Sequence, residues 1–285
     1  MAARPLALTV SVLVALSVAC AKSEPPKSES AAPPAAAPAG PNVVEVVASD
    51  FAFAMPDTVP AGPTTFHLVN QGPSIHQIQI VRLDEGKTMG DFAKASAEAG
   101  PPPSWQVLLG GPNTPVPGAS SDGSLDLAAG NYVVICGIPA PDGISHAAKG
   151  MIHPLTVVPS DVRRAMPEAD ITVTLSDYSF TFSKPLTAGR HVIRVDNGAA
   201  QPHEIFIAKL APGKKPEDLV KWVEKQAGPP PVMPMGGTTM IHPGGSNTVA
   251  IELTPGEYGL WCFFPDVKDG KPHFAHGMMQ QITVQ

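Results

Sequence analysis

Residues 130–136 read Gly-Asn-Tyr-Val-Val-Ile-Cys, and residues 256–262 read Gly-Glu-Tyr-Gly-Leu-Trp-Cys. Each stretch is an apolar segment that begins beside a tyrosine and ends in a cysteine, which predicts a late β-strand with a reactive side chain at its end. The two copies lie about 127 residues apart, a spacing too long for a solenoid repeat and suited to a duplicated domain.

The repeat extends outward from these strands in both directions. Residues 49–53, Ser-Asp-Phe-Ala-Phe, return at 176–180 as Ser-Asp-Tyr-Ser-Phe, and the run Ala-Gly-Pro-Pro-Pro at 99–103 returns unchanged at 227–231. A polar segment with two Arg and two Pro separates the copies. We therefore expect a domain at residues 42–158, a linker at 159–168 and a second domain at 169–285.

Short β-branched and alternating segments bounded by Gly and Pro dominate both copies. This pattern predicts an antiparallel β-sandwich in each. One segment in each copy breaks the pattern: residues 89–98 and 216–226 have the spacing of a helix and end before the Gly-Pro-Pro-Pro stretch. The predicted fold is all-β, with two tandem sandwiches that each carry a short helical insertion.

The start of the chain indicates export. Arg4 precedes an apolar run that is too short to span a bilayer and that leads into Leu16-Ser17-Val18-Ala19-Cys20. This resembles a bacterial lipoprotein signal, which implies removal of residues 1–19 and a lipid anchor on Cys20. A plain secretory signal with an incidental cysteine is the alternative. Residues 20–41 are rich in Ala and Pro and predict an extended tether.

Composition limits the partners. The formal net charge is −6, which gives no electrostatic reason to expect nucleic acid. The expected location is the periplasmic side of a bacterial membrane or the cell surface, with the lipid at Cys20 as the membrane contact. The sequence does not choose between inner and outer membrane, and it does not identify a redox partner protein or an oligomeric state.

Chemistry-bearing residues coincide when the two copies are superposed. Only two of the histidines in each copy match a histidine in the other, and the two remaining cysteines and one methionine pair also match. The matched pairs are His76 with His203, Cys136 with Cys262, His146 with His273, and Met151 with Met278. Taken singly, each could be an ordinary core residue, because buried Cys and Met are common. Their recurrence in one order in both copies favours a shared site.

The order His, Cys, His, Met on a sandwich of this size resembles the cupredoxins, the type 1 or blue copper domains. The resemblance implies a Greek-key, cupredoxin-like fold, one copper ion per domain and the eight paired residues above as its metal ligands. Thiolate, two imidazoles and a weak axial thioether are the donors of such a site. The loops between Cys and the second His, residues 137–145 and 263–272, are longer than in small blue copper proteins, so we expect them to hold their ligands less firmly. Phe263, Phe264 and Phe274 are expected to form an apolar collar around the second site.

Electron transfer is the leading functional hypothesis. A two-domain copper oxidoreductase is a weaker one, because no histidine flanks either cysteine to build a further copper centre. Copper handling or storage is a third, since we expect Met233, Met235, Met240 and His242 to lie together in one Pro/Gly-rich loop, and such donors suit Cu(I). A metal-free cupredoxin-like scaffold for protein contacts is the fourth. We expect no catalytic residues, and if one site alone binds copper we expect it to be the second.

Overall fold

The computed structural model describes Met1 and residues 38–98, 102–225 and 227–285. The predicted signal peptide, most of the tether and Cys20 lie outside the described residues. Residues 38–285 form one compact unit. Among the described helices, none has the length and apolar character needed to cross a membrane.

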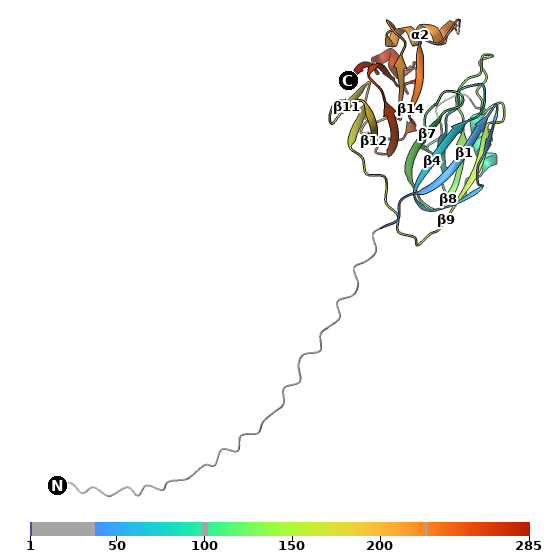
Figure 1. Cartoon of the computed structure of the whole chain (residues 1–285). Helices are drawn as coiled ribbons and strands as arrows, with labels where there is room; N and C mark the ends of the chain where they lie inside the picture. The colour runs from blue at the N-terminus through green and yellow to red at the C-terminus, as the bar shows by residue number, and fades with distance from the viewer. Residues whose placement is uncertain (2–37, 99–101, 226) are drawn as a thin grey trace. The chain divides into compact units, whose positions relative to one another are not determined.

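Two β-sheets form the framework of this unit (Figure 1). The first half contributes β1 (Asn42–Ser49), β2 (Ala52–Ala54), β3 (Thr58–Pro60), β4 (Gly62–Asn70), β5 (Gln79–Leu83), β6 (Gln106–Gly110), β7 (Ser120–Leu127), β8 (Gly130–Ile135) and β9 (Ile152–Val158). The second half contributes β10 (Ile171–Ser176), β11 (Ser179–Phe182), β12 (Gly189–Asn197), β13 (His203–Leu210), β14 (Val232–Ile241), β15 (Ser246–Leu253), β16 (Gly256–Trp261) and β17 (Met279–Val284). The all-β prediction is therefore confirmed, but the sandwiches are not wholly antiparallel, because β1 pairs parallel with β4 and β10 pairs parallel with β12.

Each half has a core between the two sheets. In β1, Val44, Val46 and Ala48 are buried and alternate with more exposed residues, so one face of the strand turns inward. The first core also holds Cys136 and Met151, and the corresponding core of the second half holds Cys262 and Met278. The candidate ligands thus lie on the packed interior of each sandwich, where water is excluded.

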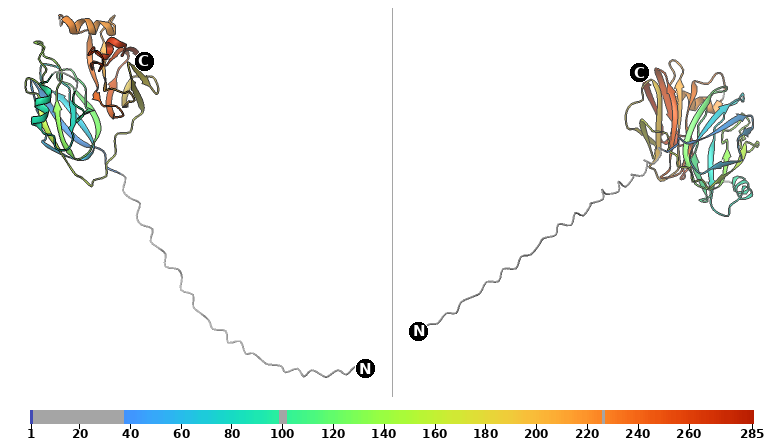
Figure 2. Two further views of the ribbon diagram at one scale, coloured as in Figure 1. Left: turned by 180° about the vertical axis from the view of Figure 1, so that it is seen from behind. Right: turned by 60° about the horizontal axis from the view of Figure 1, so that its bottom comes forward.

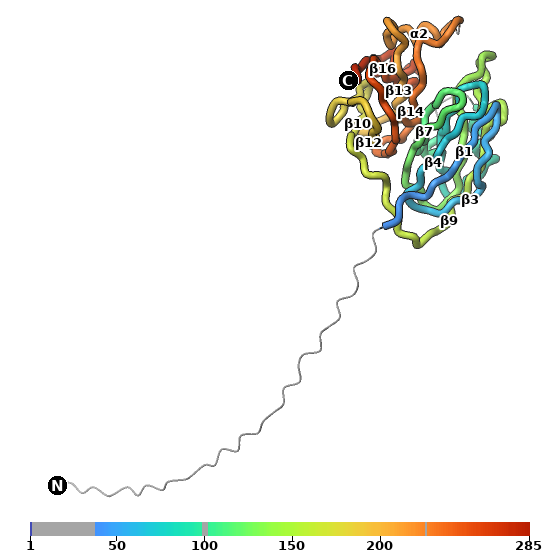
Figure 3. The backbone as a smooth tube through the Cα atoms, viewed as in Figure 1, coloured from blue at the N-terminus to red at the C-terminus, as the bar shows by residue number. Residues whose placement is uncertain are grey.

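Both sheets continue from one half into the other. The eight-stranded sheet has the order β11-β10-β12-β15-β7-β4-β1-β2, and the nine-stranded sheet has the order β17-β16-β13-β14-β6-β5-β8-β9-β3. The halves meet where β7 pairs antiparallel with β15 and β6 pairs antiparallel with β14. We call these two pairings, with the side chains between them, the joint. Figures 2 and 3 show the chain from blue to red passing through both halves. The domain boundaries at 42, 158 and 169 stay predictions.

Each half carries one helix, as expected. Helix α1 (Met89–Ser96) starts at Thr88, whose side chain accepts a hydrogen bond from the Asp91 amide while the Asp91 carboxylate accepts from the Thr88 amide. Helix α2 (Pro216–Lys225) begins with a proline and buries Leu219 in a cluster that includes Trp261. A short 3-10 helix, η1 (His273–His276), follows the loop after β16.

Candidate metal centres

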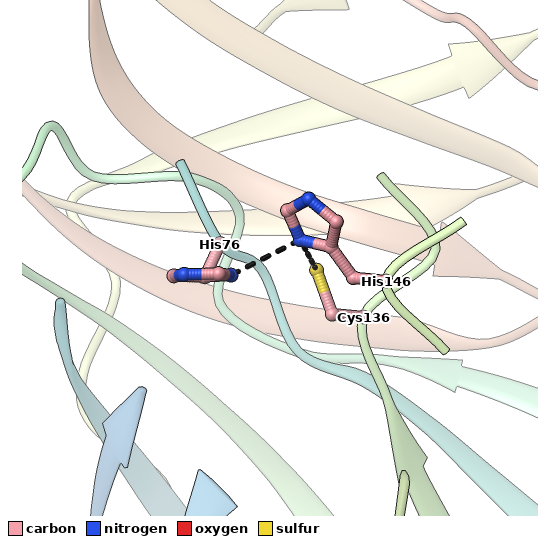
Figure 4. Close-up of side chains that lie close together, drawn as sticks. All are labelled: His76, Cys136 and His146. Carbon is pink, nitrogen blue, oxygen red and sulfur yellow. Dashed lines mark hydrogen bonds between the residues drawn. The ribbon is translucent and has the colours of Figure 1, made fainter. Parts of the chain in front are cut away.

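Three side chains of the first half converge on one point (Figure 4). His76 precedes β5, Cys136 follows β8, and His146 lies on the loop between β8 and β9. The Nδ1 atoms of His76 and His146 are 3.1 Å apart, and Cys136 Sγ is 3.5 Å from His146 Nδ1. All three residues are buried. Residues far apart in sequence thus present two imidazole nitrogens and a sulfur to a shared space.

The second half repeats this arrangement. Cys262 Sγ is 3.3 Å from His273 Nδ1 and 3.8 Å from His203 Nδ1. The rings of His203 and His273 have their centroids 4.4 Å apart. All three residues are buried here as well. Each half therefore uses the same donor atoms from equivalent positions.

The methionines are held beneath these loops by backbone hydrogen bonds. The Met151 amide donates to the His146 carbonyl at 2.9 Å, and the Cys136 amide donates to the Met151 carbonyl at 3.2 Å. Met278 has the same two bonds, to His273 at 3.0 Å and from Cys262 at 3.1 Å. Both methionines are fully buried beside their cysteines. The backbone thus ties each fourth predicted ligand to the cysteine and the second histidine of its set.

Backbone hydrogen bonds close the base of each long ligand loop. In the first, the His146 amide donates to the Ile138 carbonyl at 2.8 Å and the Ala147 amide to the Cys136 carbonyl at 2.9 Å. In the second, the His273 and Phe274 amides make the matching bonds, both 2.9 Å, to Phe264 and Cys262. The base of each loop is therefore tied directly to the cysteine. That the longer loops hold their ligands less firmly stays a prediction.

Two aspartates that sequence reasoning did not assign orient the first histidine of each set. Asp50 Oδ1 accepts from His76 Nε2 at 2.8 Å, and Asp177 Oδ1 accepts from His203 Nε2 at 3.0 Å. A proton on Nε2 leaves the Nδ1 lone pair free for a metal. Burial raises the pKa of Asp50, but hydrogen bonds from Ser74 and His76 outweigh this and keep it below its usual range. In the sequence, these two aspartates could have been noticed because the Ser-Asp pair at 49–50 recurs at 176–177.

The protonation states suit metal binding. Burial lowers the pKa of His76, His146, His203 and His273, the last to about 4, so these imidazoles are neutral near pH 7. Burial also raises the pKa of the two thiols, that of Cys136 to about 11. A bound cation would displace the thiol proton, because thiolate is the form that binds metal.

The donor sets fit copper. Ligand atoms at about 2.0 to 2.3 Å from one ion are separated by roughly 3.3 to 3.8 Å, which is close to the N–N and N–S separations seen here. Type 1 copper takes two imidazoles, one thiolate and a weakly bound thioether, and the two His, the Cys and the Met of each half would supply these donors. The Glu204 amide donates to Cys262 Sγ at 3.4 Å, so this sulfur is also hydrogen-bonded.

Both halves are cupredoxin-like. That follows from the two-sheet sandwich, in which a His before one strand, a Cys at the end of another and a His and Met on the next loop meet in one place. Among solved structures, the chain is similar to a reduced auracyanin from Roseiflexus castenholzii, with 27% identity, a TM-score of 0.32 and coverage of 42% of this chain and 99% of that one. A blue copper oxidase from Nitrosomonas europaea has 16% identity and a TM-score of 0.26 and covers 85% of this chain and 86% of its own.

A copper-containing nitrite reductase from Thermus scotoductus is similar at 12% identity, with a TM-score of 0.24, over 85% of this chain and 61% of that one. No protein-family model matches the chain, and no curated protein matches it. Because each of these TM-scores is below 0.5, the assignment depends on the strand order and donor geometry of this chain alone.

The surroundings of the second centre differ in part from the expectation. Of the predicted apolar collar, Phe264 lies against His273, with ring centroids 5.9 Å apart. Phe263 and Phe274 instead pack on each other in the cluster beneath α2. Phe263 points away because successive residues leaving a strand alternate between its faces, and Phe274 follows His273 in η1. Tyr178 replaces them, with its ring 5.6 Å from that of His273.

The Met-rich segment at 233–242 belongs to a strand. It forms β14, which pairs with β13 and β6, so its side chains point in different directions. Met233 is exposed, Met240 packs against the first half, and His242 Nδ1 is 2.9 Å from the Leu108 carbonyl. The loop expected from Pro and Gly was wrong because strand pairing across the joint orders the segment, and these side chains do not gather into one cluster.

Proposed function

We propose that this protein is an exported electron-transfer protein that binds one copper ion in each half. The observation that carries the proposal is the convergence, in both halves, of buried Cys and two His Nδ1 atoms within 4.8 Å of one another, with a buried Met tied to the same loop. When bound, copper would supply one-electron chemistry. Soft sulfur and borderline nitrogen donors suit both of its oxidation states, so little rearrangement accompanies the change.

The chain's own residues would keep each site rigid and dry. Asp50 and Asp177 fix the tautomer of the first histidine, and the loop ladders fix the second relative to the cysteine. Burial of all eight ligands excludes water from the metal. The hydrogen bond from the Glu204 amide to Cys262 Sγ would reduce the negative charge on this sulfur and thereby raise the reduction potential of the second site.

Export and a lipid anchor at Cys20 are part of the proposal. They are supported by the apolar leader that ends at Ala19-Cys20 and by the Ala/Pro-rich tether. A redox partner protein would then meet the folded unit on the periplasmic side of the membrane or at the cell surface. The length of the tether would set how far from the membrane this contact can occur. Labelling the expressed full-length chain with radioactive palmitate, with Cys20→Ser as control, tests the anchor: label on both chains, or on neither, argues against it.

An absorption spectrum tests the copper sites. The leaderless protein is titrated with Cu(II), and an intense thiolate-to-copper band is expected to saturate at two copper ions per chain. Cys136→Ser and Cys262→Ser are each expected to remove one half of the band and one equivalent of copper. A colourless protein that binds Cu(I) would instead favour copper handling, and a protein that binds no copper would favour a metal-free scaffold.

A further inference from the structure

The outer ring nitrogen of His273 faces a buried carboxylate. His273 Nδ1 lies 3.3 Å from Cys262 Sγ, so its Nε2 atom points to the other side of the ring, away from the sulfur. This Nε2 atom is buried and has no hydrogen-bond partner among the described residues. Asp266 Oδ2 lies 3.7 Å from it. That separation is longer than a hydrogen bond, so the carboxylate acts on the ring through its charge.

Hydrogen bonds hold Asp266 in this place. The Tyr178 hydroxyl and Gln201 Nε2, the latter at 2.9 Å, both donate to Oδ2, and the Lys268 amide donates to Oδ1 at 2.8 Å. Gln201 is fixed in turn, because its Oε1 accepts from the Val267 amide at 3.2 Å. These bonds favour the ionised carboxylate and hold the pKa of Asp266 well below its usual range. Asp266 is 3% exposed, so a buried negative charge lies beside one ligand ring of the second centre.

The first centre has an alanine at the matching position. The turns of the two ligand loops correspond, because the Ala140 amide donates to the Ile144 carbonyl at 2.8 Å and the Asp266 amide donates to the Lys271 carbonyl at 2.8 Å. Ala140 is therefore the counterpart of Asp266. Both residues are buried. The first ligand loop thus places a methyl group where the second places a carboxylate.

The neighbouring residues of the first centre differ as well. Phe51 is the counterpart of Tyr178 in the repeat, and its ring centroid lies 4.9 Å from that of His146, but it has no hydroxyl to hold a carboxylate. The acid of this loop is Asp142, whose side chain is 51% exposed and pairs with Lys149. Solvent and the paired cation offset that charge. Two matching donor sets therefore have unequal charge around them.

We propose that Asp266 is a positioning residue that acts through His273 to set the reduction potential of the second centre below that of the first. The proposal rests on the proposed function, because it requires copper in both halves. The oxidised site carries one more positive charge than the reduced site, and a neighbouring negative charge stabilises it. An electron from an external one-electron reductant therefore comes to rest on the first centre. It leaves the second centre, which is oxidised, as the first is reduced; no bond breaks and no proton moves.

The size of the effect follows from Coulomb's law. At an effective dielectric constant of about 20, a unit charge within about 10 Å changes the balance between two charge states by roughly tenfold or more. A tenfold change corresponds to about 59 mV for a one-electron couple. Removing the charge of Asp266 is therefore expected to raise the potential of the second centre by about 59 mV or more.

Spectroelectrochemical titration of the copper-loaded full chain measures both potentials. Cys136→Ser and Cys262→Ser assign each copper band to one centre. In the native chain we expect the second centre to be the harder to reduce. Asp266→Asn keeps the size of the side chain and removes its charge, so we expect the potential of the second centre to rise and that of the first to stay the same. Glu204 is also buried in the second half, but it is present in every variant and does not enter the comparison.

Two variants separate the charge of Asp266 from its structural contacts. Asp269→Asn is the matched control, because Asp269 is an acid of the same loop that bonds to His276 Nε2 at 3.1 Å, and its side chain is 37% exposed. We expect a much smaller shift from it. Tyr178→Phe loses the same hydrogen bond as Asp266→Asn but keeps the carboxylate, so the potential is expected to fall or stay the same. A purely structural role would move the potential in the same direction in both.

A readout without copper comes from nitrogen-15 NMR of the copper-free chain. A carboxylate beside Nε2 favours the tautomer of His273 that carries its proton on that atom. We expect this tautomer in the native chain near pH 7 and a larger share of the Nδ1-protonated tautomer in Asp266→Ala. The alanine variant has the side chain of the first loop, and it also replaces Asp266→Asn in the titration if the asparagine variant does not fold.

The outcomes distinguish this proposal from the proposed function. Two copper bands whose second-centre potential does not rise in Asp266→Asn, or rises equally in Asp269→Asn, would overturn the role of Asp266 and leave the electron-transfer function standing. A native second centre that is easier to reduce than the first, or a His273 tautomer unchanged in Asp266→Ala, would do the same. Absence of copper bands in the native chain would overturn the proposed function and the difference in potential with it.

Discussion

Replacing Glu204 by Gln is expected to change how the stability of the copper-free protein depends on pH. Burial raises the pKa of the Glu204 carboxyl from 4.5 to about 7, against the lowering effect of hydrogen bonds from the Phe263 amide and Asn113. Because the folded chain then holds a proton that the unfolded chain releases, this group stabilises the fold below pH 4.5, and the stabilisation is lost as pH rises to about 7. A pKa rise of this size corresponds to about 3 kcal/mol.

The ligand histidines act in the opposite direction. Their pKa values are lowered by burial, so the unfolded chain binds more protons than the folded one below about pH 6.5, and stability from these groups rises with pH. The measurement must therefore compare native and Glu204→Gln chains, in which the histidines are the same. Urea unfolding of both copper-free proteins between pH 4.5 and 8 gives the difference.

Between pH 4.5 and 8, we expect the free energy of unfolding of the native chain to fall by about 3 kcal/mol relative to that of Glu204→Gln. Glu257→Gln is the control. Hydrogen bonds from Gln281 and Thr283 lower the pKa of Glu257, so this substitution leaves the pH dependence of the unfolding free energy unchanged above pH 5. A difference between native and Glu204→Gln that stays flat from pH 4.5 to 8 would refute the burial argument for this carboxyl.

Three further changes test the second centre and its support. Asp177→Asn removes the carboxylate that holds His203 Nε2, and we expect copper affinity to fall by roughly 10-fold to 100-fold in a competition titration; unchanged affinity would contradict the orienting role. Met278→Leu removes the weak axial donor that favours oxidised copper, so voltammetry is expected to show a higher potential with the visible band retained, and an equal or lower potential would count against an axial role. Tyr258→Phe loses the hydrogen bond from its hydroxyl to the Thr254 carbonyl at 2.9 Å and is expected to cost about 1 kcal/mol in thermal unfolding without changing the copper band; loss of the band would contradict a purely structural role.

The candidate ligands could be found in the sequence because the chain is duplicated. A single Cys or Met in an apolar strand is explained equally well by ordinary core packing. The duplication argued against that explanation, because it showed which positions recur together. The strands around them were also predictable, because alternation of apolar residues is a local property of the chain. The helices at 89–98 and 216–226 followed from local spacing as well, and they correspond to α1 and α2.

The immediate supports of the ligands were not predictable in the same way. The Ser-Asp pair was visible as a repeat, but only the fold places Asp50 against His76 and Asp177 against His203, 26 residues away in each case. The ladder that holds the long loops was also hidden, because loop length gives no information on how the loop folds back on its own base.

The sequence by itself determined the duplication, the strand pattern and the order of the metal ligands, because these depend on periodicity and composition along the chain. Only the tertiary structure decided the joint. Gln79 in β5 is polar and yet fully buried, and its Nε2 atom donates to the Met240 carbonyl of the other half at 3.1 Å. A period of two identifies the two faces of a strand, but what covers the second face depends on contacts between residues more than a hundred positions apart.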